Sequence, residues 1–348
     1  MPLRGLPEHR RRHPRGGRLM TRTGIEYLRA KDQDSAVALV AEDPDAAFLA
    51  GGTTELDLAL KDRVVHPSRF VDIGRLPLRG VTRDGDRLRV AALTTMEELA
   101  ADPTVRARLP LVREALLLGA STQLRNMATI GGNLLQRTRC RYFRDPDVAA
   151  CNKREPGSGC AAIEGVARMH AILGAGPSCI ALHASDLCVP LVALDAVVEL
   201  LDADGPRRVP LTDFYLTPGD RPDVETVLRH GELLTHVEIP LLPAGTRSAY
   251  IKVRDRTSYE FGLTTAGAAV QVDDGTITMA RVGLGGVGTV PWRSWEAERV
   301  LVGSPANERT FAAAAQAAIR DPFTVPGTEF KVELAKRTIV RILRTVTS

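Results

Sequence analysis

Short apolar runs separated by polar turns predict a mixed α and β structure in the first third of the chain. Thr95 is followed three residues later by Glu98, which fits a capping box and predicts a helix that begins at Met96. A second helix is expected to end at Gly119. The expected strands cover residues 47–50, 70–73 and 88–93, and the second helix covers 109–118.

From residue 197 the pattern changes to the alternation that is typical of an antiparallel sheet. Strands are expected on both sides of the polar turn at 202–205, and again within 246–284, where residues 273–275 form a hairpin turn. The proline-rich segment 240–243 is the predicted linker between an N-terminal and a C-terminal domain. Three helical patterns close the chain, at 292–301, 307–319 and 329–346.

The composition, with 44% apolar and 25% charged residues, is that of a soluble globular protein. The formal charge is +4, but residues 1–22 contain seven arginines and one glutamate, so the rest of the chain is close to neutral. No basic surface for nucleic acid is therefore expected. No apolar run approaches the ~20 residues that span a bilayer. Because the arginine-rich start lacks the apolar core of a signal peptide, residues 1–19 are expected to be a disordered basic arm or the product of an upstream start.

All five cysteines lie between residues 140 and 188. Their surroundings are polar, loop-like and rich in arginine and lysine, which is a poor setting for inert core thiols, although buried structural thiols remain an alternative. The odd number of cysteines disfavours a disulfide framework, and the absence of a close Cys-x-x-Cys pair disfavours a zinc site. Four thiolates on an irregular loop suit an iron–sulfur cluster, although their spacing matches no common cluster signature.

Two segments with paired glycines, residues 48–54 and 128–133, suggest a site for a diphosphate. Paired glycines let backbone N–H groups approach a pyrophosphate, and Thr or Asn side chains can donate to its oxygens. Neither segment has the glycine spacing of a Rossmann or Walker loop, so an ordinary turn is the alternative for each. Two such turns close to a group of thiols favour a cofactor that contains a diphosphate.

Two further groups of polar residues stand out. Asp186 offers a carboxylate that can accept from a ribityl or ribose hydroxyl, or cap a helix at 188–195, and both roles can hold at once. Lys252, Arg254 and Arg256 alternate along an expected strand and so share one face, for which a solvated strand surface is the alternative. The seven histidines show no ligand spacing, and the chain has no Gly-x-Ser-x-Gly or His-Glu-x-x-His motif.

Five sequence motifs between residues 50 and 293 carry a likeness to a known family, and the likeness runs from about residue 20 to the C-terminus. They are residues 50–53 with 57–58, 123–133, 185–187, 250–254, and 284–287 with 291–293. Together they resemble the FAD-binding (medium) subunit of the molybdenum hydroxylases, the group that contains xanthine dehydrogenase and aldehyde oxidoreductase. The cysteine-rich stretch resembles a subset of that family, the bacterial aldehyde oxidoreductase flavoprotein subunits and more distantly those of hydroxybenzoyl-CoA reductase, which add a 4Fe–4S cluster.

The resemblance implies an α+β fold of the para-cresol methylhydroxylase type. Residues 20–240 would form an FAD-binding domain of two subdomains, and residues 244–348 a C-terminal α+β domain with an antiparallel sheet and helices. An insert at about 137–180, called the cysteine insert below, would bind the cluster. The FAD-binding residues implied are Phe48, Leu49, Ala50, Gly51, Gly52, Thr53, Thr54, Glu55, Thr129, Gly132, Asn133, Asp186 and Lys252. The implied cluster ligands are Cys140, Cys151, Cys160 and Cys179, with Cys188 in the core.

The same resemblance implies electron relay as the function, with no catalytic residue in this chain. A molybdopterin-binding large subunit would oxidise an aldehyde, a small subunit with 2Fe–2S clusters would pass the electrons on, and FAD here would deliver them to an acceptor, within a heterotrimer. Two alternatives remain: a self-sufficient flavin oxidase or dehydrogenase, and a non-catalytic iron–sulfur sensor. Cluster insertion implies assembly in the cytoplasm, and export to the periplasm with a partner subunit remains compatible with the sequence.

Overall fold

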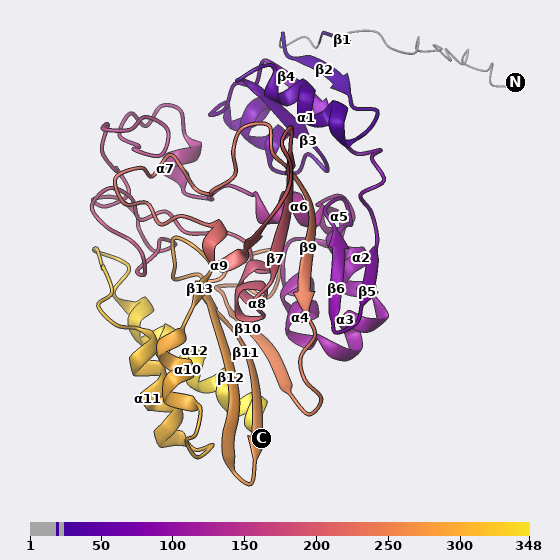
Figure 1. Cartoon of the computed structure of the whole chain (residues 1–348). Coiled ribbons are helices and arrows are strands. Elements are labelled where there is room, and N and C mark those ends of the chain that lie inside the picture. Colours follow the sequence, from indigo (N-terminus) through magenta and orange to yellow (C-terminus); the bar gives the residue numbers. More distant parts are fainter. Residues whose placement is uncertain (1–18, 21–23) are drawn as a thin grey trace, which may run out of the picture.

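Three β-sheets organise the chain, and the α+β class predicted from the sequence is confirmed (Figure 1). The computed structural model describes residues 24–348 and the backbone of residues 19–20. Residues 1–18 of the predicted basic arm lie outside the described residues, and Leu19 pairs with Tyr27. In the described part of the chain, no helix is long and apolar enough to cross a membrane.

The first sheet is small and partly parallel. Its strand order is β1-β2-β4-β3, and β4 pairs in parallel with both β2 and β3. The first helix begins at Asp32, whose carboxylate accepts from the backbone of Ser35, and it buries Val37 and Val40 in the core of this sheet. The elements are β1 (Leu19–Met20), β2 (Glu26–Arg29), α1 (Gln33–Ala41), β3 (Ala46–Leu49), η1 (Asp57–Asp62, a π-helix) and β4 (Arg69–Asp72).

The second sheet is antiparallel and joins two distant parts of the chain. β6 pairs with β9, and β9 pairs with β7, so residues 87–91 lie beside residues 233–240. Alternate strand residues such as Val90 and Val237 enter the largest core together with Leu99 and Val112 of the helices. In spatial order the strands are β5 (Val81–Asp84), β6 (Arg87–Ala91), β9 (Leu233–Pro240), β7 (Val197–Asp202) and β8 (Gly205–Pro210).

The helices around this sheet begin and end largely where the sequence predicts. Thr95 and Glu98 form the expected capping box, and the helix before Gly119 ends at Leu118. Short helices carry the chain past the second glycine segment. Two more lie much later in the chain, one before β7 and one after β8. The helices are α2 (Met96–Ala101), α3 (Pro103–Arg108), α4 (Pro110–Leu118), α5 (Thr122–Arg125), α6 (Ile130–Leu134), α8 (Cys188–Ala193) and α9 (Leu211–Phe214).

The third sheet is covered on both faces, which explains the nearly continuous apolar run in its central strand. Ala268 and Val270 of β11 enter a core with the last three helices, whereas Ala269 enters the core that contains α4 and α8. Trp292 and Arg293, expected to begin a helix, instead form an edge strand, and the helix starts at Trp295. The elements are β10 (Arg247–Val253), β11 (Thr264–Asp273), β12 (Thr276–Gly285), β13 (Trp292–Arg293), α10 (Trp295–Leu301), α11 (Glu308–Ala318) and α12 (Phe330–Thr347).

The predicted linker joins the second sheet to the third and is held in place by hydrogen bonds. Pro240 ends β9, the backbone N–H of Leu241 donates to Asp86, and Arg108 donates to the carbonyl oxygen of Leu242. The domain boundaries proposed at this point remain a prediction.

The cysteine insert is irregular, and α7 (Arg141–Arg144) is the one helix that the structure shows in it. It forms the loops on the left of Figure 1, beside the three helices of the C-terminal region. Ala162 and Ile180 pack with Val325, which lies in the segment before α12. The guanidinium group of Arg154 donates to several backbone carbonyl groups of the insert, and these bonds replace the ladder that a regular element would supply.

Candidate cofactor site

Two cavities of about 340 and 230 Å³ share Thr53, Thr54 and Gly132 in their walls. We call the joined space the groove. The smaller cavity lies between the first and second sheets, and the larger one extends to β10 of the third sheet. All of the predicted FAD-binding residues line the groove except Leu49, which lies in β3 without reaching either cavity. The structure therefore brings together residues that are up to two hundred positions apart in the sequence.

The first glycine segment makes a turn that no larger residue fits. A Cβ atom on Gly51 would lie 2.0 Å from the carbonyl oxygen of Met127, so the turn after β3 touches the backbone that precedes the second glycine segment. Gly52 has a φ of +70°, in the left-handed region that favours glycine. The close approach of the two segments leaves backbone atoms, rather than side chains, facing the groove. This is the wall that a diphosphate requires.

The second glycine segment is fixed by its own side chains. The Thr129 hydroxyl accepts from the backbone N–H of Gly132 at 3.2 Å, and so begins α6. The amide oxygen of Asn133 accepts from the hydroxyl of Ser185 at 2.6 Å. Ser185 precedes Asp186, so this bond ties the second glycine segment to the third motif of the groove.

Asp186 faces the groove as half of a buried ion pair. Its carboxylate accepts from the Tyr250 hydroxyl and from the Lys252 ammonium group, each at 2.7 Å. The expected helix-capping role of Asp186 is wrong, because Ser185 accepts from the first backbone N–H of α8 instead. Burial and the neighbouring Asp186 carboxylate raise the pKa of Tyr250 well above its ordinary value, so its hydroxyl stays protonated as a donor.

The three alternating cations are not a solvated strand surface. The Lys252 side chain is only 2% exposed, and it donates to the Leu118 carbonyl oxygen at 3.2 Å in addition to Asp186. Arg254 donates to the same carbonyl group at 3.2 Å. Arg256 lies beyond the end of β10, in a loop that lines the groove beside Lys252. Of the three cations, only Arg256 is exposed to solvent, as the alternative of a solvated strand surface required.

Arg139 is a groove residue that the sequence reasoning missed. It lines the larger cavity and also a neighbouring one of about 370 Å³, and it donates to the Thr54 hydroxyl at 3.2 Å. Burial, together with the nearby Arg144, lowers the pKa of Arg139 to about 10. Its position directly before Cys140, in a stretch that is rich in arginine and lysine, gave no local sign of this role.

The four predicted cluster ligands line one small cavity of about 10 Å³. The backbones of Cys151 and Cys160 pair as an isolated antiparallel β-bridge. Burial raises the pKa of the Cys140 thiol to about 12, with a smaller contribution from Cys151 and Cys179. Within the described residues, however, no three His, Cys, Asp or Glu side chains come close enough to hold one metal ion. Four cysteine thiolates are the donor set of an iron–sulfur cluster, but a cavity of about 10 Å³ would have to widen to admit one.

The fifth cysteine is in the core, as expected. Cys188 begins α8, is fully buried, and its sulfur lies 3.0 Å from the Tyr215 hydroxyl. Burial raises the pKa of its thiol to about 11. Cys188 does not line the cavity of the other four cysteines, so it serves as a natural control for them.

Many of the cations around the four cysteines have partners of their own. Arg144 pairs with Asp57 and Asp62, and Arg154 is bonded to backbone carbonyl groups. Lys153 also has partners, Glu225 and the Pro222 carbonyl oxygen, and it acts on one of the thiols as well: although burial raises the pKa of Cys179, the Lys153 charge opposes that rise. His170 also contacts one of the four cysteines, with its Nε2 3.2 Å from the Cys140 sulfur.

A long groove with a glycine wall and a buried Asp–Lys pair, set between three sheets, defines a protein that binds an extended dinucleotide cofactor. The model for the FAD-binding domain in molybdopterin dehydrogenase matches residues 22–242, and that for the CO dehydrogenase flavoprotein C-terminal domain matches residues 248–346. The chain therefore belongs to the family of FAD-binding subunits of the molybdopterin-dependent dehydrogenases. Within that family it is an oxidoreductase subunit.

Named relatives support this assignment. The aldehyde oxidoreductase FAD-binding subunit PaoB of Escherichia coli K12 is 43% identical over 320 residues, which cover 91% of this chain and 96% of the relative. The carbon monoxide dehydrogenase medium chain of Hydrogenophaga pseudoflava is 29% identical and covers 85% of this chain and 86% of its own. A solved structure of carbon monoxide dehydrogenase from that organism, which lacks the Mo-pyranopterin moiety, matches with a TM-score of 0.72 and 28% identity over 92% of this chain and 96% of its own.

Proposed function

We propose that this chain is the FAD and 4Fe–4S electron-transfer subunit of a molybdenum-dependent aldehyde oxidoreductase. It would pass electrons from the 2Fe–2S clusters of a partner subunit to an external acceptor. The observation that carries the proposal is the groove, in which both glycine segments and the Asp186–Lys252 pair face one continuous space. The 43% identity to an aldehyde oxidoreductase subunit supports the aldehyde as substrate of the assembled enzyme.

The groove residues fit FAD in chemical terms. The backbone of the Gly51–Gly52 turn and the Thr53 and Thr54 hydroxyls would hold the diphosphate, and the Asp186 carboxylate would accept from a ribityl or ribose hydroxyl. Lys252 holds Asp186 in place, because its ammonium group donates to the carboxylate from a buried position. Bound FAD would supply the exchange between two-electron and one-electron steps. No side chain of this chain is proposed as a catalytic group.

The four cysteines that share one cavity are the proposed ligands of a 4Fe–4S cluster. Their thiols need to ionise when iron binds, and bound iron favours the thiolate form strongly enough to overcome the raised pKa of Cys140. The irregular backbone of the cysteine insert, with few regular hydrogen bonds, is suited to the widening that the cluster requires.

The proposed partners are a molybdopterin-binding large subunit and a small subunit with 2Fe–2S clusters, in a heterotrimer. Relatives named as a medium chain and as a FAD-binding subunit support an assembly of several chains. We place assembly in the cytoplasm, where the thiols are reduced when iron is inserted, with export to the periplasm open to a complex that folds before transport.

Anaerobic co-expression with the partner subunits, followed by flavin, iron and absorbance analysis, tests the proposal. We expect one FAD and about four irons in this chain, the content of one 4Fe–4S cluster. FAD without iron in this chain would instead support a self-sufficient flavin enzyme, and iron without FAD a sensor. If reconstitution with both leaves neither bound, the proposed function is wrong.

A further inference from the structure

Glu225 lies between the groove and the cysteine cavity and is bonded to both sides. Its Oε2 accepts from the Arg137 guanidinium group at 2.8 Å, and its Oε1 accepts from the Lys153 ammonium group at 2.9 Å. Arg137 lines the smaller cavity of the groove, beside the Gly51–Gly52 turn. Lys153 lines the cavity of the four cysteines. One carboxylate therefore links a cation of each site.

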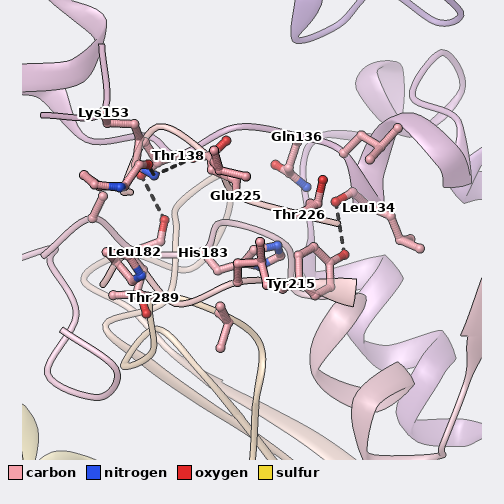
Figure 2. Close-up of a pocket in the computed structure, with 17 residues that line it drawn as sticks. Leu134, Gln136, Thr138, Lys153, Leu182, His183, Tyr215, Glu225, Thr226 and Thr289 are labelled. Carbon is pink, nitrogen blue, oxygen red and sulfur yellow. Dashed lines mark hydrogen bonds and ion pairs between the residues drawn. The ribbon is translucent and has the colours of Figure 1, made fainter. Parts of the chain in front are cut away.

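The Lys153 end of the link is sheltered from solvent, whereas the Arg137 and Glu225 side chains are 28% and 27% exposed. Lys153 is only 7% exposed, and it also donates to the Pro222 carbonyl oxygen at 2.7 Å. In Figure 2 the Lys153 and Glu225 side chains point toward one another, although they come from different segments, and both line a small cavity of about 40 Å³. Burial opposes ionisation of Glu225, but Arg137 and Lys153 hold its pKa below the ordinary value. The carboxylate is therefore charged in the neutral pH range.

Each of the two cations also acts on its own site. Arg137 opposes the burial that raises the pKa of Glu55, a residue in the groove wall, and its guanidinium group lies 4.6 Å from the Phe143 ring centre. Lys153 lines the cavity of the four cysteines. Because the two cations lie in the walls of the two sites, the carboxylate charge that neutralises them is felt at both.

We propose that Glu225 is a positioning residue that sets the electrostatic balance of both redox sites by holding Arg137 against one and Lys153 against the other. The inference rests on the proposed function, since it assumes that the two cavities hold FAD and a cluster. Reduction adds an electron to each centre, so a nearby cation favours it and a nearby anion opposes it. Loss of the Glu225 charge leaves both cations without their carboxylate and should favour reduction at both sites.

The test is Glu225→Gln in the complete complex, which keeps the shape of the side chain and removes its charge. Anaerobic potentiometric titration, followed by flavin absorbance and by electron paramagnetic resonance of the cluster, should show both midpoint potentials shifted in the positive direction. The matched control is Glu199→Gln on β7, because Glu199 also lies between two basic groups, Arg89 at 2.6 Å and His236 at 3.5 Å, but lines neither site. The control should move neither potential.

Unchanged potentials in a Glu225→Gln complex that holds normal FAD and iron would overturn the inference. If Glu225→Gln does not fold, Lys153→Gln takes its place. Its cluster midpoint potential should fall more than its flavin midpoint potential. Potentials that both equal the wild-type values would overturn the inference. Failure of the proposed function looks different, because the wild-type complex itself would then lack FAD or iron. If only iron is missing, the flavin midpoint potential still tests the effect of Glu225 through Arg137: a positive shift in Glu225→Gln supports it, and an unchanged potential overturns it.

Discussion

The groove and the cysteine insert obtain their shapes in different ways. The groove is assembled where regular elements end, after β3, at α6, before α8 and on β10, and its wall allows no Cβ on Gly51. The cysteine insert has one four-residue helix among its described residues, and Arg154 holds much of its backbone. The groove is therefore shaped before any ligand arrives, whereas the proposed cluster site would reach its final form only when a cluster binds.

The largest expected effect separates the two regions completely. Cys151→Ser should abolish the iron signal while FAD content stays unchanged, because the serine hydroxyl is a poor ligand for a cluster and the groove does not include this residue. Iron and flavin assays on anaerobically purified protein measure both. Cys188→Ser is the matched control, and it should retain both groups. Full iron content in Cys151→Ser would rule out the proposed ligand set.

A substitution in the groove wall should have the opposite selectivity. In Gly51→Val the new side chain meets the Met127 carbonyl oxygen, and relief of that overlap costs about 3 kcal/mol. Since about 1.4 kcal/mol is tenfold in affinity, FAD retention measured by equilibrium dialysis should fall at least about tenfold. Gly176→Ala, at a position with open space, should leave it unchanged. Equal FAD affinity for both variants would show that the wall is not closely fitted.

A smaller effect is expected at the third motif. Asp186→Asn removes the charged partner of the buried Lys252 and should weaken FAD binding by about 2 kcal/mol. Asp72→Asn is a close control: Asp72 is equally buried at 13% exposure and also accepts from a tyrosine hydroxyl and a cation, but that cation, Arg29, is 43% exposed. FAD titration by fluorescence should distinguish the two. A similar loss in both variants would mean that Asp186 acts only through general stability.

The smallest effect concerns the backbone of the cysteine insert. Arg154→Lys loses the planar fork that reaches the carbonyl groups of Tyr142, Phe143 and Asp145, so the insert should open more easily by about 1–2 kcal/mol. Hydrogen exchange of residues 142–160 should become faster, while exchange in the groove stays the same. Arg299→Lys, an exposed substitution on α10, should change neither. Unchanged exchange in Arg154→Lys would show that other contacts hold the insert.

Much of the fold was predictable because its signals are local. The capping box at Thr95, the end of α4 at Gly119 and the two hairpin turns depend on a few adjacent residues, and the structure confirms them. β9 and β13 were not predicted as strands, because each is defined by pairing with a partner far away or at a sheet edge. The π-helix after β3 likewise has no distinct sequence pattern.

In the candidate site, too, residues in local motifs were predictable and residues that act through distant contacts were not. The glycine turns and Asp186 were found from local motifs, and the structure places them in one groove. The roles of Arg139, Tyr250 and Glu225 depend on contacts between distant segments, so no local pattern revealed them. For Tyr250 a signal was present: it lies two residues before Lys252 on one strand, so the two side chains share a face.

The chain is proposed to relay electrons and not to oxidise the aldehyde itself. Anaerobic stopped-flow mixing with an aldehyde, followed by flavin absorbance, tests that claim most directly. The complete complex should reduce its flavin within the time of one turnover, and the isolated chain loaded with FAD should not reduce it. Rapid aldehyde-dependent reduction of the flavin in the isolated chain would contradict the account and show a self-sufficient flavin enzyme.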